Sequence, residues 1–220
     1  MSIRVRVWDL PTRLFHWALM LGVVGMVVSA NMGQMERHVQ LGQWVMALLL
    51  FRVVWALVGG HWSRLSSLDL SPKALLGYWR GQREGGPGHS PAGAWASVGL
   101  VLWLLLQVGT GLMADDEIAT TGPLTALVPE AWVRLATFWH KGPGKLVLLV
   151  LVLLHVAALV WYRVKRGQAL VPAMWHGDKV LAQAAPASRD DARSRLLALV
   201  LFGLCYAGVR WVFSLQPALM

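Results

Sequence analysis

The chain has 220 residues, of which 56% are hydrophobic and 14% are charged, and its formal net charge is +9. Soluble domains usually have about a quarter of their residues charged, so this composition excludes a soluble nucleic-acid-binding protein and a disordered chain. The single cysteine, Cys205, excludes a disulfide framework and a cysteine-based zinc or iron–sulfur site within the chain. Thirteen tryptophans, a residue enriched at lipid headgroup level, indicate a membrane protein.

Five apolar stretches have about the 20 residues that a helix needs to cross a bilayer. Because lipid offers the backbone no hydrogen-bonding partner, each stretch is predicted to be a helix. They cover Leu10–Ala30, Val39–Gly59, Ala92–Ala114, Lys145–Tyr162 and Leu196–Leu215. The first is predicted to be a retained span, because its apolar run is too long for a signal peptide and no small-residue cleavage site follows it. The sequence therefore predicts an all-α integral membrane helical bundle, with residues 1–181 as a four-helix domain, 182–195 as a polar linker and 196–220 as a fifth, C-terminal transmembrane helix.

The connecting segments also have patterns of their own. Ser71 and Pro72 predict the N-cap and first turn of a short interfacial helix. The stretch Pro123–Trp139 alternates apolar and aromatic residues and is predicted to lie on the outer membrane surface. Residues 81–88 are predicted to be a flexible turn, and residues 182–191 a loose polar linker.

Lysine and arginine predict the orientation of the spans. Fourteen of the eighteen that flank the spans lie at the N-terminus or in the loops after the second and fourth spans. The opposite side has four, together with the acidic residues Asp115, Asp116, Glu117 and Glu130. The positive-inside rule therefore predicts a cytoplasmic N-terminus and a C-terminus on the outside.

The histidines are the candidates for chemistry. His155 lies within the fourth span without a polar neighbour in the sequence, and an ionisable group in that position is costly unless it has a function. At the helical rise per residue, His16 lies about 8 Å and His155 about 12 Å from the cytoplasmic ends of their spans. His38 opens the second span and His140 the fourth, both on the outer side.

Two facing pairs are therefore predicted, His16 with His155 inside and His38 with His140 outside. Four imidazoles arranged in this way in a helix bundle suit two six-coordinate b-type haems. Zinc or non-haem iron would need a carboxylate or a third close ligand, and the spans contain no Asp or Glu. The alternative for each histidine is a neutral ring hydrogen-bonded to a neighbouring helix.

The remaining polar candidates have simpler interpretations. His61 and His176 are predicted to be solvated or to face lipid headgroups, and His89 to cap the third span. Arg52, inside the second span, either snorkels to the surface or forms an ion pair with a haem propionate.

Several strings of the sequence resemble the bacterial cytochrome b561 family, which includes the cytochrome b subunits of nickel–iron hydrogenases. The first-helix string, Val7-Trp-Asp-Leu-Pro-Thr-Arg-Leu-Phe-His-Trp17, is the most specific. The others are His38-Val-Gln-Leu-Gly42, Phe51-Arg-Val-Val-Trp-Ala-Leu-Val-Gly59, Gly88-His-Ser-Pro-Ala-Gly93, Trp139-His140 and Leu153-Leu-His-Val156. The resemblance covers about residues 7–180. Ser90 replaces a family asparagine, and the segment Ala173-Met-Trp-His-Gly-Asp-Lys179 departs from the family's Ala-Met-Ile-Thr-Gly-Arg-Lys.

The resemblance implies a four-helix core that holds two b haems, with ligands at His16, His38, His140 and His155. It implies a multi-pass protein of the bacterial inner membrane, whose C-terminus is then periplasmic. Its partners would be membrane lipid, a quinone or quinol, and a periplasmic or membrane redox protein such as a c-type cytochrome or a hydrogenase. The chain would then be an electron-transfer subunit of an oxidoreductase system.

Two alternatives stay open at this point. One is an autonomous membrane oxidoreductase of the same fold, acting as a superoxide oxidase or a ferric reductase. The other is a haem-free scaffold or transport protein whose histidines hydrogen-bond between helices. Quinone pockets have no reliable short sequence motif, so no residues are assigned to one.

Overall fold

The computed structural model describes residues 2–118 and 120–215 of the chain, so the part of the predicted fifth helix over 216–220 lies outside the described residues. The chain divides into two compact units. The first unit comprises Met1–Trp17, Phe51–Gly99 and Leu154–Leu201, and the second comprises Ala18–Leu50, Leu100–Leu153 and Phe202–Met220. The long helices contribute residues to both units.

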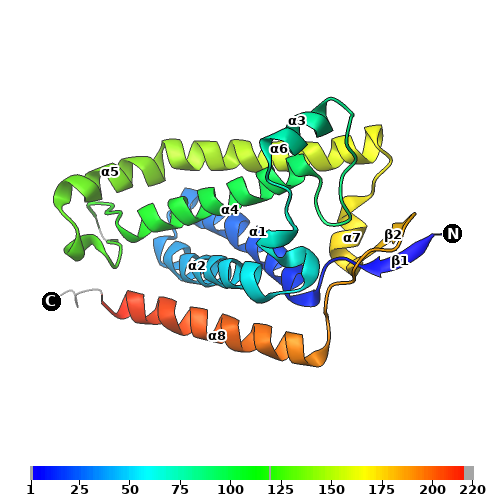
Figure 1. Ribbon diagram of the computed structural model, residues 1–220. Coiled ribbons are helices and arrows are strands. Elements are labelled where there is room, and N and C mark those ends of the chain that lie inside the picture. The colour runs from blue at the N-terminus through cyan, green and yellow to red at the C-terminus, as the bar shows by residue number, and fades with distance from the viewer. Residues whose placement is uncertain (1, 119, 216–220) are drawn as a thin grey trace. The chain divides into compact units, whose positions relative to one another are not determined.

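The described residues are mainly helical (Figure 1). The long helices are α1 (Leu10–Asn31), α2 (Met35–Val58), α4 (Pro91–Leu112), α6 (Pro143–Lys165) and α8 (Ala192–Ser214), and the short ones are α3 (Pro72–Trp79), α5 (Glu130–Lys141) and α7 (Leu170–His176). Single 3₁₀ turns occur at His61–Ser63, Leu65–Ser67 and Thr125–Leu127. Within the described residues, five helical segments are long and apolar enough to cross a membrane. The predicted all-α class and the five spans are thus confirmed.

The predicted short helix after the second span is α3. Ser71 is its N-cap, and its side-chain oxygen accepts a hydrogen bond of 3.1 Å from the backbone N–H of Ala74. Pro72 occupies the first helical position, where its missing N–H costs no hydrogen bond. The local capping rules therefore predicted this element correctly.

The start of the fourth span differs from the prediction. Gly142 ends α5 with its N–H bonded to the carbonyl oxygen of Phe138 at 3.0 Å, and Pro143 begins α6. Proline suits the first turn of a helix and cannot continue an existing one. His140 consequently lies in the last turn of α5, directly before α6, and the fourth candidate span covers both helices, Glu130–Lys165.

The first unit contains a small sheet that the sequence did not predict. Strands β1 (Ile3–Arg6) and β2 (Asp178–Leu181) pair antiparallel, next to α7 (Figure 1). An ion pair of 2.7 Å joins Arg6 to Asp178, which are opposite each other in the register. Four-residue strands are too short to show an alternating pattern, and these two lie at opposite ends of the chain.

The predicted loose linker is anchored in this unit. The backbone N–H of Ser188 donates to the carbonyl oxygen of Arg6, and its hydroxyl group donates to that of Val7, both at 2.7 Å. Asp190 accepts hydrogen bonds from Arg6 at 3.2 Å and from Arg195 at 3.0 Å. Because Ser188 is buried, the residues before α8 are held against the N-terminal segment and are not loose.

The second unit has an apolar core from four helices. Its buried members are Val45, Leu49, Leu104, Val108 and Leu148, and α1 adds partly buried residues such as Val23. Helices α1 and α2 approach each other closely here, because a Cβ atom at Gly22 would lie only 2.7 Å from Val45. Small residues at such contacts let membrane helices pack tightly.

Helix α8 also packs in the second unit. Its Phe202 and Tyr206 stack on Trp44 of α2, with ring centres 5.9 and 4.8 Å apart. Arg210 donates a hydrogen bond of 3.1 Å to the side-chain oxygen of Gln43. The predicted fifth span therefore has specific contacts with α2.

Candidate functional site

Two of the predicted site residues meet in the first unit. His16 comes from α1 and His155 from α6, and their ring centres are 6.5 Å apart at an interplanar angle of 50°. Among the described residues, neither ring has a hydrogen-bond partner, and Nδ1 of His16 is fully buried. A buried polar atom without a partner is rare in proteins and calls for a physical explanation.

The other two predicted residues meet in the second unit. His38 comes from α2 and His140 from α5, and their ring centres are 6.0 Å apart at 80°. Nδ1 of His38 is 3.0 Å from the carbonyl oxygen of Met26, and Nδ1 of His140 is 2.8 Å from that of Gln107. A carbonyl oxygen only accepts, so each Nδ1 carries the proton and each Nε2 keeps its lone pair. Both rings therefore have a nitrogen ready to bind a metal ion.

The spacing of both pairs fits a shared metal ion. A metal–imidazole bond is about 2 Å long, which puts the centres of two rings on one ion roughly 6 Å apart. Within the described residues, no group of three or more His, Cys, Asp or Glu side chains gathers to hold a metal ion. A protein-only zinc or iron site is thus disfavoured, whereas haem iron takes four ligands from its own macrocycle and needs only two histidines.

Arg52 lies in the first unit on α2 and is partly buried. Its guanidinium donates a hydrogen bond of 3.0 Å to the carbonyl oxygen of Ser63. The side chain is therefore fixed by the 3₁₀ turn that follows α2. Its remaining guanidinium N–H groups are the donors that a carboxylate ligand would need.

A buried carboxyl group next to this turn was not predicted as functional. The two oxygens of Asp9, which is fully buried, accept hydrogen bonds from the backbone N–H groups of Thr12 at 2.8 Å and Gly60 at 3.1 Å. They also accept from the hydroxyl of Ser63 at 2.7 Å and the indole N–H of Trp55 at 3.3 Å. An Asp directly before the first turn of α1 is a recognisable N-cap. The sequence gives no indication of the contacts that Asp9 makes with residues about 50 positions away. Asp9 thus ties the start of α1 to the end of α2.

The role predicted for His89 is wrong. Ser90 caps α4, because its hydroxyl oxygen accepts a hydrogen bond of 3.1 Å from the backbone N–H of Gly93. Ser90 stands directly before the first residue of α4, and its short side chain reaches the free N–H groups of the first turn.

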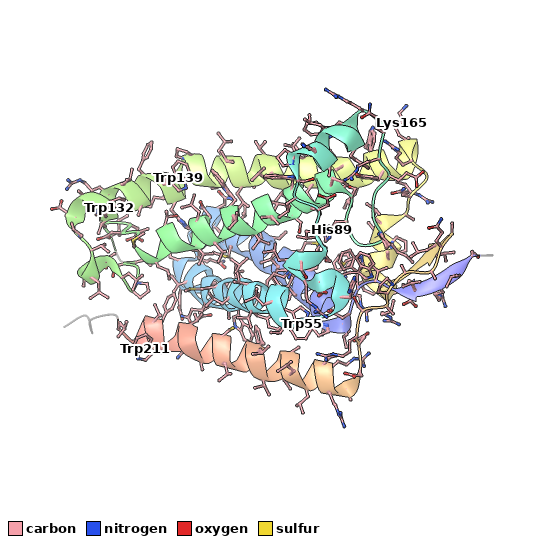
Figure 2. All side chains as sticks on the ribbon, viewed as in Figure 1. Trp55, His89, Trp132, Trp139, Lys165 and Trp211 are labelled. Atoms are coloured by element: carbon pink, nitrogen blue, oxygen red, sulfur yellow. The ribbon has the colours of Figure 1, made fainter. Side chains whose placement is uncertain are left out.

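His89 instead lies within the first unit, where Figure 2 labels it. Its ring meets that of Trp8 edge-on, with centres 4.9 Å apart, and its Nδ1 is buried without a hydrogen-bond partner among the described residues. Burial, with smaller contributions from the positive charges of Arg52 and Lys179, lowers the pKa of His89 to about 4. The ring is therefore neutral at neutral pH. His61 and His176 are exposed, as predicted.

Comparison with protein families identifies the chain. The family model described as prokaryotic cytochrome b561 matches residues 7–177, a range that includes the four paired histidines and ends before α8. No curated protein and no solved structure matches the chain. The family implies haem b and electron transport, in agreement with the five spans and the two histidine pairs. The chain is a multi-pass membrane protein that belongs to the prokaryotic cytochrome b561 family.

Proposed function

We propose that the chain is a di-haem b-type cytochrome that transfers electrons across the bilayer between the quinone pool and a partner redox protein. The observation that carries this proposal is the pair of histidine contacts, with ring centres 6.5 and 6.0 Å apart, each in its own unit. His16 and His155 hold one haem b, and His38 and His140 hold the other. Arg52 binds a propionate of the haem at His16 and His155.

The protein's part in this chemistry is to position the ligands and to keep water away. Bound haem supplies reversible one-electron chemistry at its iron. The hydrogen bonds from Nδ1 of His38 and His140 fix the plane and the tautomer of each ring. Apolar residues of the same unit, among them Leu49 and Leu148, pack into a low-dielectric core.

The uneven distribution of lysines and arginines among the loops supports one orientation of the protein in the membrane. The loops that carry fourteen of the eighteen flanking lysines and arginines are assigned to the cytoplasm of a bacterial inner membrane, with the C-terminus in the periplasm. His16 and His155 then lie on the cytoplasmic side, and His38 and His140 on the periplasmic side. Electrons that pass between the pairs cross the membrane.

The acidic loop after α4, which contains Asp115, Asp116 and Glu117, supports a periplasmic redox partner, such as a c-type cytochrome or a hydrogenase. A hydrogen bond within the loop joins two of its described residues, because Asp116 accepts from the backbone N–H of Thr120 at 2.8 Å. The backbone N–H of Asp115 donates to the hydroxyl of Thr137 on α5 at 2.9 Å. Its carboxyl groups would attract a basic surface on the partner.

The test is the haem content and spectrum of the purified protein. We expect two haems for each chain, sharp α bands in the reduced spectrum, and no binding of carbon monoxide, because both iron atoms have two histidine ligands. A quinol analogue should reduce the haem in the absence of any other protein. A colourless protein, or a haem that binds carbon monoxide readily, would contradict the proposal.

A further inference from the structure

Helix α4 carries a glycine where His140 of α5 comes closest. A Cβ atom at Gly111 would lie 2.8 Å from Cε1 and 3.1 Å from Nδ1 of His140. Distances below 3.0 Å essentially never occur for real Cβ atoms, so any side chain there would displace the ring. At Gly109, one glycine earlier on the same helix, nothing lies within 4 Å of the Cβ position. The close approach is therefore specific to Gly111.

A single residue of α4 holds His140 through two hydrogen bonds. Nδ1–H of His140 donates to the carbonyl oxygen of Gln107 at 2.8 Å, and the side-chain amide of Gln107 donates to the carbonyl oxygen of His140 at 2.9 Å. Gln107 is only 8% exposed, and hydrogen bonds shielded from water are stronger. The ring can reach the Gln107 carbonyl only because Gly111 leaves space for its Cε1 edge.

We propose that Gly111 is a positioning residue for the haem that His38 and His140 hold, and that it lowers the reduction potential of this haem. By lacking a Cβ atom, Gly111 seats the His140 ring on the carbonyl oxygen of Gln107. A hydrogen bond to the outer ring nitrogen makes the imidazole a more basic ligand. A more basic ligand stabilises ferric over ferrous iron, and second-shell hydrogen bonding is an established lever on haem potentials. This inference rests on the proposed function, in which His140 is a haem ligand.

The test compares Gly111→Ala with the matched control Gly109→Ala in the full-length protein. Redox titration is followed by the α bands, and the electron paramagnetic resonance spectrum of the oxidised protein is recorded. The component that disappears in His38→Ala identifies the haem in question. In Gly111→Ala we expect its midpoint potential to shift upward and its resonance signal to change, with the other haem unaltered. The Gly109→Ala protein should behave like the parent.

A second variant keeps the test decisive if Gly111→Ala does not assemble. Gln107→Leu keeps the carbonyl oxygen that accepts from His140 but removes the side-chain donor that holds the His140 backbone. The ring is then seated less firmly on that carbonyl oxygen, so we expect a smaller upward shift of the same component. Loss of second-shell partners typically costs about 10–100-fold in metal affinity, so this haem should also be the first to dissociate on dilution. The inference is overturned if Gly111→Ala behaves like Gly109→Ala, if both haems shift equally, or if only Gln107→Leu is obtained and its potentials are unchanged. A parent protein without haem would instead contradict the proposed function.

Discussion

The rings of His38 and His140 each donate from Nδ1 to a backbone carbonyl oxygen, whereas the rings of His16 and His155 have no hydrogen-bond partner among the described residues. The charges around the two pairs differ as well. The unit of His16 and His155 also contains the partly buried guanidinium of Arg52, while the other unit carries the acidic loop after α4. Hydrogen bonds to ligands and negative charge stabilise oxidised iron, and positive charge stabilises reduced iron. We therefore expect the two haems to differ in reduction potential although each has two histidine ligands. The haem at His38 and His140 should have the lower potential.

The largest expected effect is the loss of one haem without the other. Replacing His38 or His140 by Ala should halve the haem content and leave one spectral component, and replacing His16 or His155 should leave the opposite one. Each loss removes a ligand and leaves an unpaired imidazole in an apolar site. Haem content per chain and redox titration measure the outcome. Variants with Ala at His61, His89 or His176 should keep both haems, and loss of iron on changing His89 and not His38 would contradict the pairing.

The next largest effect concerns the buried carboxyl group of Asp9. Asp9→Ala leaves the buried N–H donors of Thr12, Gly60 and Trp55 without an acceptor, and each such donor costs about 1–3 kcal/mol. We expect a loss of roughly 3 kcal/mol or more in the free energy of unfolding, seen as a lower melting temperature in detergent. Because Asp9 belongs to the unit of His16 and His155, their haem should dissociate first on heating.

The exposed Glu84 offers a control for this substitution. Glu84→Ala should change the melting temperature little, since surface substitutions usually stay within about 0.5 kcal/mol. Equal melting temperatures for the Asp9 and Glu84 variants would show that the buried hydrogen bonds do not stabilise this unit.

A smaller effect is the pH dependence caused by His89. Its pKa is lowered from 6.5 to about 4, so between these values the unfolded chain binds a proton that the folded chain does not. The free energy of unfolding should therefore fall as the pH is lowered from about 6.5 to 4, by up to about 3 kcal/mol. His89→Phe should flatten this part of the melting profile. A profile with the same slope in both proteins would show that His89 is not the group responsible.

The smallest effect is expected at the acidic loop. Electron transfer with a basic redox partner should slow at high salt, because exposed charges are screened beyond about 8–10 Å. Asp115→Asn with Asp116→Asn should lower the rate at low salt and weaken its salt dependence. Stopped-flow reduction at several ionic strengths measures both. Rates that do not respond to salt in either protein would exclude the loop as a docking surface.

The spans and the positions of the histidines are accessible from the sequence because they depend on local properties. An uninterrupted apolar run predicts a span, and the rise per residue gives the depth of His16 and His155 within their helices. The first-helix string, which ends at Trp17, resembles a family that binds haem b, and so indicates which cofactor the histidines hold. The structure then places each expected pair of rings about 6 Å apart.

Apart from the cap at Ser90, the features that the sequence did not show depend on contacts between distant segments. Ser188 binds Arg6 and Val7 from the far end of the chain, and β1 pairs with β2 in the same way. The burial of His89 depends on Trp8, which no helical or strand period connects to it. Nothing in the local sequence distinguishes Gly111 from other glycines of membrane helices, because its close contact is with His140 of α5.

Redox titration of the intact protein tests the central claim most directly. The account predicts two one-electron components of equal amplitude with different midpoint potentials. The lower component should be the one that vanishes in His38→Ala, and the higher one should vanish in His16→Ala. A single component in the parent protein, or a lower component that survives His38→Ala, would contradict the assignment of two haems to two differently supported histidine pairs.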